Sequence, residues 1–309
     1  MCFTRKYFAG VKIMDHEVRD NLCNLKAIGA IVSNEIFKTK PVRATFRRTV
    51  LKTIITKAET AELEIPDSLY TALADAMSES DDFSYRMYLT DNGEHIRCSI
   101  RESNQQLCHG TTGLSVWQAS CDLAAFMTYF MDCRDKHILE LGAGCGLAGI
   151  STAASFPSCT VDLTDYDPKV LQQLELNVAA SNLADPSKVR VLPLEWSSFS
   201  VDDLDMIPDF IIAADVVYDK QLCPPLINVI RSLLDRNPGA IAYIACTVRD
   251  SETVRHFRRL LEEAHFRIDQ CSFERETIMF LDCSQIKFTT KYPFHSTLES
   301  PTILFQLLP

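Results

Sequence analysis

The sequence predicts an α/β fold in which helices cover both faces of a mostly parallel β-sheet. Three observations support this prediction. Short apolar runs alternate with helix-length amphipathic stretches from His137 to Ala264, a glycine-rich loop follows the first run, and 309 residues suffice to bury a large core. We expect a small N-terminal helical unit and a β-hairpin to precede this sheet.

The elements before the sheet are predicted by spacing and turn residues. Apolar residues four apart predict a helix over 41–60, where Pro41 suits the first helical position, and a second helix over 67–77. Alternating polar and apolar residues around Asn92-Gly93 predict a hairpin over 85–100. The chain therefore begins with a helical part and continues with strands.

The sheet itself is predicted from eight apolar runs. Strands are expected over 137–141, 160–164, 189–194, 210–214 and 240–246, and helices to 155, over 168–181, over 224–235 and over 252–264. Three later runs, 266–273, 277–282 and 302–308, have no long helices between them. They predict an antiparallel hairpin at one edge of the sheet.

The charge of the chain divides along the same line. Residues 1–60 hold 12 basic and 5 acidic side chains, a surplus of +7, whereas residues 61–309 carry −17. We expect residues 1–84 to form a helical accessory or substrate-recognition region, and residues 85–309 to form the main domain. Arg43, Arg47 and Arg48 are candidates for contact with a protein partner, since a basic surface steers partners; a solvated helix face is the alternative.

Composition also bounds the partners and the location of the protein. The acidic main domain argues against direct binding of nucleic acid, and no apolar run approaches the roughly 18 residues of a membrane span. The 12 cysteines are scattered, without a Cys-x-x-Cys pair. We therefore expect a cytoplasmic monomer with reduced cysteines, no metal and no membrane partner.

The strongest signal for function is the glycine loop from Glu140 to Gly149, Glu-Leu-Gly-Ala-Gly-Cys-Gly-Leu-Ala-Gly. Glycines between a strand and a helix let the backbone turn sharply and approach a nucleotide-like ligand. Its Gly144-x-Gly146-x-x-Gly149 spacing also fits the dinucleotide fingerprint, so an NAD-binding oxidoreductase is one alternative. A tight turn without a ligand is another.

Three neighbouring residues bear on the choice of ligand. Asp165 ends the second predicted strand, where it could bind ribose hydroxyls of either NAD or S-adenosylmethionine. Glu140 would repel a pyrophosphate and suit the ammonium group of S-adenosylmethionine. Trp196, after the third strand, offers a flat surface for an adenine ring.

Several motifs resemble one enzyme family. Glu140-Leu141-Gly142-x-Gly144-x-Gly146 is similar to motif I of the seven-β-strand (class I) methyltransferases, and Asp215-Val216-Val217-Tyr218 to the Asp-x-x-Tyr motif of the family-16 protein lysine methyltransferases. Four segments carry the resemblance: Lys40-Pro41-Val42-Arg43 with Phe46-Arg47-Arg48, His109 to Leu114 with Trp117, Ala213 to Tyr218, and Thr247-Val248-Arg249. Cys145 stands where many relatives have a small residue.

The resemblance implies a Rossmann-like class I fold, S-adenosylmethionine as cofactor, no metal, and a lysine of eukaryotic elongation factor 2 as acceptor. It implies roles for the remaining loop and strand-end residues as well. The cofactor-binding residues are expected to be Trp117, Glu140, Gly142, Ala143, Gly144, Gly146, Asp165, Trp196 and Ala214. Methylation of another protein or of RNA stays open, as does a binding module without turnover.

Asp215 and Tyr218 are the expected catalytic residues. Methyl transfer to an amine needs a neutral, aligned lysine nitrogen and no covalent nucleophile. We expect Asp215 to orient the amine and Tyr218 to line the lysine channel by cation–π contact, on a shared face if a helical turn follows. The structural alternative for Asp215 is a cap on the next helix. Enzymes that methylate amino groups of nucleic acids typically carry Asn/Asp-Pro-Pro-aromatic here, which favours a protein substrate.

Overall fold

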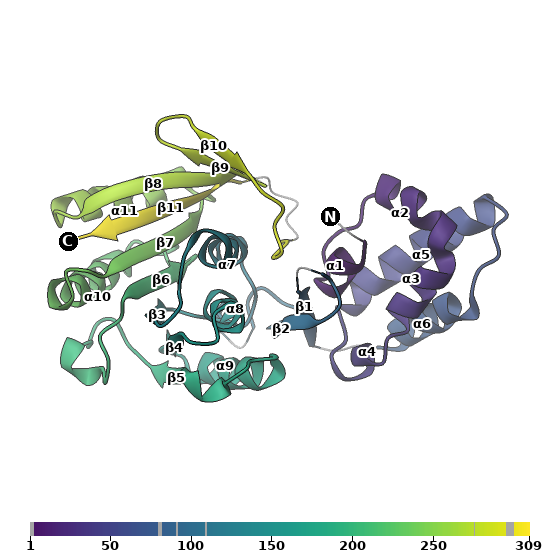
Figure 1. The fold of residues 1–309 in the computed structure, drawn as a ribbon, viewed down its shortest axis with the longest axis horizontal. Helices are drawn as coiled ribbons and strands as arrows, with labels where there is room; N and C mark the ends of the chain where they lie inside the picture. The colour runs from purple at the N-terminus through teal and green to yellow at the C-terminus, as the bar shows by residue number, and fades with distance from the viewer. Residues whose placement is uncertain (1–2, 80–81, 91, 109, 275, 295–299) are drawn as a thin grey trace.

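The computed structural model describes residues 3–79, 82–90, 92–108, 110–274, 276–294 and 300–309. Three parts follow one another along the chain: an N-terminal helical unit, a two-stranded hairpin and a helix-covered sheet (Figure 1). His109, in one of the segments that carry the family resemblance, lies outside the described residues.

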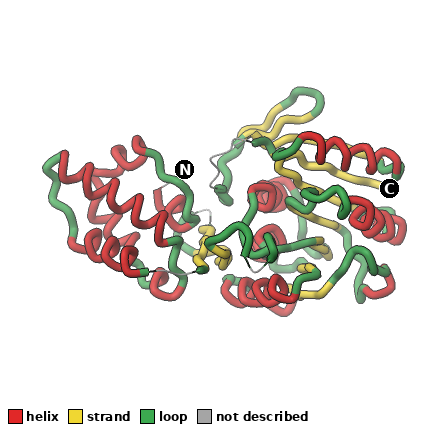
Figure 2. Tube along the Cα trace, turned by 180° about the vertical axis from the view of Figure 1, so that it is seen from behind, coloured by secondary structure: helices red, strands yellow, loops and turns green. Residues whose placement is uncertain are grey.

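The N-terminal unit contains only helices among its described elements (Figure 2). They are α1 (Phe3–Phe8), α2 (Asp15–Asn21), the short 3-10 helix η1 (Leu22–Asn24), α3 (Leu25–Val32), α4 (Ile36–Thr39), α5 (Ala44–Thr60) and α6 (Asp67–Ser78). Spacing predicted α5 and α6. The helix α5 begins at Ala44 rather than at Pro41 because the Pro41 carbonyl accepts a hydrogen bond from Tyr85 N–H (2.8 Å). Tyr7, Leu51 and Leu69 are fully buried in the core of this unit.

The arginines of α5 do not form a free basic surface. Arg47 is 4% exposed and pairs with Glu79, and Arg48 donates to two carbonyl oxygens at the C-terminal end of α6 (both 2.6 Å). Arg43 donates to Asn104 Oδ1 (2.9 Å), just beyond the hairpin. Arg47 is therefore buried within the helical unit, and all three arginines have partners within the chain.

The helical unit also has a net charge of about zero. Residues 1–60 carry the surplus of positive charge, but residues 61–84 add seven acidic side chains and no basic one. The two helices α5 and α6, one from each segment, pack on each other (Figure 1). The basic charge predicted for the first 60 residues thus belongs to a unit with no net charge.

The hairpin joins the two larger parts. Its strands β1 (Phe83–Leu89) and β2 (Ile96–Ser103) pair antiparallel around the predicted turn, with Tyr85 opposite Arg101. Met87 and Leu89 belong to the core of the helical unit, whereas Tyr88 and Ile100 belong to the core under the main sheet. Because successive side chains of a strand point to opposite faces, one strand serves both cores.

The main sheet has the predicted α/β architecture. Its strands in the described residues are β3 (His137–Leu141), β4 (Thr160–Asp165), β5 (Val189–Pro193), β6 (Phe210–Ala214), β7 (Ile241–Thr247), β8 (Arg267–Glu274), β9 (Thr277–Phe280), β10 (Gln285–Lys287) and β11 (Thr302–Leu308). They lie in the order β10-β9-β8-β11-β7-β6-β3-β4-β5, and β7 to β5 in this order are parallel. The Rossmann-like fold class is therefore confirmed.

Helices cover both faces of this sheet. They are α7 (Gln118–Phe130), α8 (Leu147–Ser155), α9 (Pro168–Ala180), α10 (Cys223–Arg236) and α11 (Ser251–Glu263), with short 3-10 helices η2 (Pro186–Lys188) and η3 (Val201–Asp203). Ile138 and Ile212 pack towards α7, α8 and α9, whereas Leu139 and Ile211 pack towards α10 and α11. This alternation explains why the parallel strands are apolar throughout.

The antiparallel part of the sheet is larger than the predicted edge hairpin. Strand β11 inserts between β7 and β8 and pairs antiparallel with both, with Thr302 opposite Thr247 and Phe273. Strands β9 and β10 then extend the sheet beyond β8. Apolar periodicity identified β8, β9 and β11 but could not show that the last strand returns to the middle, since strand order depends on long-range pairing.

The strand order places a crevice at one end of the sheet. The chain runs outwards from β3 through β4 to β5, then returns to β6 on the other side of β3 and continues to β7. Such a reversal separates the connections that leave the carboxyl ends of β3 and β6. Ligands of open α/β sheets bind at this point, and the glycine loop begins there.

Candidate functional site

The glycine loop connects β3 to α8 with three left-handed glycines. The φ angles are +61° at Gly142, +54° at Gly144 and +77° at Gly146. A Cβ on Gly142 would lie 2.9 Å from Val216 Cγ1, and one on Gly144 would lie 3.1 Å from the Gly113 carbonyl oxygen. Both positions therefore require glycine, which leaves bare backbone at the crevice.

A cavity of about 520 Å³ lies at this end of the sheet. It brings together ten of the eleven residues predicted for the site: Trp117, Glu140, Gly142, Ala143, Gly144, Asp165, Trp196, Ala214, Asp215 and Tyr218. The structure places Gly146 outside this lining, where a Cβ would lie 2.7 Å from Leu174 Cδ2. Gly146 thus allows α9 to pack against the loop. Cys145 also lines the cavity, and its buried thiol donates to the Gly113 carbonyl oxygen (3.5 Å).

Glu140 lines the cavity with a side chain that is almost closed to solvent. The residue is 1% exposed, and Gly149 N–H in the first turn of α8 donates to its Oε2 (2.8 Å). Burial raises the pKa of Glu140 to about 8, a shift that the Gly149 hydrogen bond opposes and the charge of Asp165 increases. The carboxyl group is therefore mostly neutral at pH 7, and a cation bound beside it would favour its charged form.

Asp165 is the last residue of β4, as predicted. Its Oδ2 accepts a hydrogen bond from Gly144 N–H (3.3 Å), and its Oδ1 accepts one from Asp167 N–H (3.1 Å). Burial raises the pKa of this carboxyl group. The side chain is thus tied to the glycine loop, and a carboxylate in this position keeps acceptor capacity for further donors in the cavity.

The two tryptophans of the chain line the cavity, and both are half-buried. Trp196 lies against the glycine loop, with its Cζ2 3.3 Å from where a Cβ on Gly142 would be. Trp117 precedes α7, and its indole N–H donates to the Thr112 carbonyl oxygen (3.1 Å). The guanidinium carbon of Arg249 lies 4.6 Å from the centre of the Trp117 ring, a cation–π contact.

Asp215 connects three elements at the end of β6. Its side chain is 4% exposed, and its φ of +54° is a left-handed conformation that aspartate tolerates better than most residues. Oδ1 accepts from Thr247 N–H (2.9 Å), and Oδ2 accepts from Ala119 N–H (3.2 Å), the Thr247 hydroxyl (3.0 Å) and Arg249 (2.9 Å). The carboxylate thus caps the start of α7 rather than the following helix α10.

Tyr218 lies at the cavity but does not share a helical face with Asp215. No helical turn follows Asp215, and α10 begins only at Cys223, so this conditional expectation is wrong. Tyr218 is 58% exposed, and partial burial raises its pKa. Tyr166, 68% exposed, lines the same cavity, so two aromatic rings are available where solvent enters.

Sequence reasoning missed two residues of this site. Tyr166 directly follows Asp165. An aromatic residue next to an acidic residue at the end of a strand is the pattern that could have predicted it. Arg249 belongs to the segment Thr247-Val248-Arg249 that carried the family resemblance, but its pairing with Asp215 spans 34 positions and could not be seen from spacing.

The described residues contain no group of three or more His, Cys, Asp or Glu side chains that could hold a metal ion. Within the same parts of the chain, every helix is too short or too polar to cross a bilayer.

Comparisons with known proteins agree with this geometry. The family model described as lysine methyltransferase matches residues 96–263. Protein-lysine N-methyltransferase EEF2KMT of Mus musculus is 32% identical over 233 residues, which cover 71% of this chain and 69% of the mouse protein. Its Homo sapiens counterpart is 31% identical over 254 residues and 76% of each chain.

Among solved structures, precorrin-6y C5,15-methyltransferase from Geobacter metallireducens is 12% identical, with a TM-score of 0.43. The match covers 67% of this chain and 92% of that one, and a likeness this low does not bear on function. The family model, in contrast, spans more than half of the chain and includes the glycine loop and the end of β6. This chain belongs to the lysine methyltransferase family.

Proposed function

We propose that this protein transfers methyl groups from S-adenosylmethionine to a lysine side chain of eukaryotic elongation factor 2. The observation that carries the cofactor assignment is the single cavity in which the glycine loop, Glu140 and Asp165 meet. The names of the mouse and human relatives support the substrate assignment.

The residues of the cavity fit this cofactor. The closed space around Gly142 and Gly144 leaves backbone groups, rather than side chains, to hold the amino-acid end of the ligand together with Ala143. Glu140 suits the ammonium group, since a cation would stabilise its ionised form. A pyrophosphate would hold Glu140 in its neutral form and gain nothing from it, whereas a cation gains a charge partner, which favours S-adenosylmethionine over NAD.

The remaining cofactor residues are assigned by shape and chemistry. Asp165 would accept hydrogen bonds from two ribose hydroxyls, and Trp196 would border the adenine ring. Trp117 would lie against the ligand from the α7 side, and Ala214 would contribute backbone close to the reacting atoms. Gly146 would act indirectly, by shaping the loop.

S-adenosylmethionine would supply a methyl group on a sulfonium, so the protein has to hold a neutral acceptor amine in line with that group. We propose that Asp215 orients this amine through Oδ1, which accepts one hydrogen bond from the described residues, whereas Oδ2 accepts three. Arg249 places a positive charge beside the same carboxylate, and a nearby positive charge favours the neutral form of an approaching lysine.

Tyr218, with Tyr166 beside it, would line the channel through which the lysine enters. Exposed aromatic rings attract an ammonium group by cation–π contact. This contact does not require N–H groups on the lysine, so it persists as methyl groups replace them. Holding the amine in line with the methyl group is the main contribution that we assign to the protein, and such alignment is worth roughly 7 to 11 kcal/mol in favourable cases.

The experiment that tests the cofactor assignment is calorimetric titration with S-adenosylhomocysteine and, separately, with NAD. We expect binding of S-adenosylhomocysteine and no binding of NAD. The substrate assignment is then tested with labelled S-adenosylmethionine and an extract from cells that lack this enzyme. Label on a band other than elongation factor 2, or on RNA, would contradict it.

Four further properties belong to the same proposal. We propose that the enzyme is a cytoplasmic monomer and docks on protein rather than nucleic acid, as the acidic charge of residues 61–309 suggests. We also propose residues 1–84 and 85–309 as its two units; residue 84 lies within β1, which contributes to both cores. Light scattering tests whether the protein is a monomer, and binding assays with RNA test whether it prefers protein over nucleic acid.

A further inference from the structure

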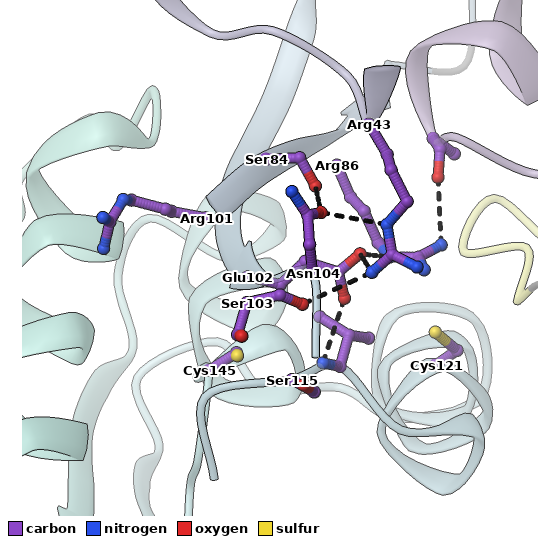
Figure 3. Close-up of polar contacts among 12 residues, drawn as sticks. Arg43, Ser84, Arg86, Arg101, Glu102, Ser103, Asn104, Ser115, Cys121 and Cys145 are labelled. Carbon is purple, nitrogen blue, oxygen red and sulfur yellow. Dashed lines mark hydrogen bonds and ion pairs between the residues drawn. The ribbon is translucent and has the colours of Figure 1, made fainter. Parts of the chain in front are cut away.

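A buried ion pair lies between the helical unit and the cavity, outside the residues assigned above. Arg86 of β1 is 8% exposed and Glu102 of β2 is 3% exposed, and Arg86 Nε donates to Glu102 Oε1 (2.7 Å) (Figure 3). Removing two charges from water costs several kcal/mol per ion, so such a pair must be held by further hydrogen bonds. Some of these hydrogen bonds connect the pair to the helical unit, and others connect it to the wall of the cavity.

One direction leads to the helical unit. Arg86 donates through a second nitrogen to the carbonyl oxygen of Ala9, directly after α1 (3.1 Å). Arg43, just before α5, approaches the same Glu102 carboxylate at 3.8 Å and donates to the Ser103 carbonyl oxygen (3.3 Å) (Figure 3). The helical unit is therefore linked to Glu102 twice, once from Ala9 through Arg86 and once directly by Arg43.

The other direction leads to the cavity. Val116 N–H donates to Glu102 Oε2 (3.2 Å), and Val116 itself lines the cavity next to Trp117. The strand end that follows Glu102 is tied to the same segment, because Ser103 N–H donates to the Leu114 carbonyl oxygen (2.6 Å). Glu102 thus fixes the position of the backbone directly before Trp117, through the hydrogen bond from Val116 N–H.

Glu102 also forms part of a second hollow. A groove of about 620 Å³ on the helical unit is lined by Arg43, Arg86 and Glu102, together with residues of α2 and α5. One carboxylate therefore faces this groove and, through Val116, supports the wall of the cavity. Glu102 is therefore connected to both hollows, to the groove through its own carboxylate and to the cavity through Val116.

We propose that Glu102 is a positioning residue that fixes Trp117 against the cofactor and couples this wall to the N-terminal helical unit through Arg86. The inference rests on the proposed function, since it assumes that the cofactor occupies the cavity beside Trp117. The helical unit is then a structural part of the cofactor site in addition to any contact with substrate.

Two double variants test the hydrogen bond to Val116. Arg86→Met with Glu102→Gln removes both buried charges but keeps an amide oxygen for Val116 N–H. Arg86→Met with Glu102→Leu removes the charges and the acceptor together. Because both variants lack the link to Ala9, their difference reports the oxygen acceptor at position 102, which serves Val116 N–H and also lies near the Arg43 guanidinium.

We expect the Leu double variant to show an S-adenosylmethionine KM about tenfold above that of the Gln double variant, with kcat changed less than about twofold. In a Trp196→Phe background Trp117 is the only tryptophan, so its fluorescence should shift in the Leu variant and not in the Gln variant. Glu102→Asp, which keeps the charge but shortens the side chain, should also raise this KM and serves if the Leu variant does not fold.

A matched control removes a different ion pair, in which Asp162 is buried and Arg190 is partly exposed. Arg190 and Asp162 pair on β5 and β4 (2.6 Å) away from the cavity lining, so Arg190→Met with Asp162→Leu should lower the melting temperature without changing KM. Equal KM values for the two position-102 double variants would overturn the proposal while leaving the proposed function intact. Failure of the unmodified protein to bind S-adenosylhomocysteine would overturn both.

Discussion

Replacing Glu140 with glutamine should stabilise the cofactor-free protein at alkaline pH and leave it nearly unchanged at acidic pH. Glutamine has the shape of the neutral carboxyl group and keeps an oxygen for Gly149 N–H, which now donates to Glu140 Oε2 at 2.8 Å. The residue is 1% exposed, so the substitution changes charge without creating a cavity.

The magnitude follows from the pKa of Glu140, which burial raises from an ordinary value of 4.5 to about 8. Between these values the unfolded chain has lost the proton while the folded protein retains it, so the unfolded state binds fewer protons. Stability therefore falls as pH rises through this window. From pH 5 to pH 8 the loss attributable to Glu140 is roughly 3 to 4 kcal/mol, since each pH unit within the window contributes about 1.4 kcal/mol.

The assay is urea unfolding of the unmodified protein and of Glu140→Gln at pH 5, 6.5 and 8. Groups distant from Glu140 titrate alike in both proteins, so the difference between the two curves reports Glu140 together with its coupling to Asp165. We expect this difference to be small at pH 5 and to favour the glutamine variant increasingly up to pH 8. A difference that stays constant over this range would refute the assignment of a neutral, buried Glu140.

Three other predictions concern the rest of the chain. Asp215→Ala should lower stability by about 2 to 4 kcal/mol in thermal unfolding, because Thr247 and Arg249 lose their acceptor; an unchanged melting temperature would contradict this. Arg47→Glu should unfold the helical unit by circular dichroism, whereas exposed Lys52→Glu should not. Tyr218→Ala should leave the melting temperature unchanged and reduce kcat/KM for the protein substrate about tenfold, and unaltered kinetics would exclude it from the lysine channel.

Sequence reasoning performed well where a signal is local. Strand β3 has the predicted bounds, and the glycine loop, Asp165 and Trp196 meet in one cavity as expected, because parallel strands present their carboxyl ends at one edge. The helices α1 to α4 were not predicted, since each is eight residues or shorter and too brief to show a helical period.

The errors arose where structure depends on distant contacts. Arg47 looked like part of a solvated basic face, but it pairs with Glu79, 32 positions away. Asp215 looked like a residue before a helical turn, yet its partners come from α7 and β7. The central placement of β11 likewise depends on pairing with strands formed earlier in the chain. Charge and spacing alone do not encode these partners.

The central proposal is most directly tested by incubating the purified protein with S-adenosylmethionine and purified eukaryotic elongation factor 2, followed by peptide mass spectrometry. The proposal predicts one or more methyl groups on a lysine of elongation factor 2, absent when S-adenosylmethionine is omitted. Unmodified elongation factor 2, under conditions in which the protein binds S-adenosylhomocysteine, would contradict it.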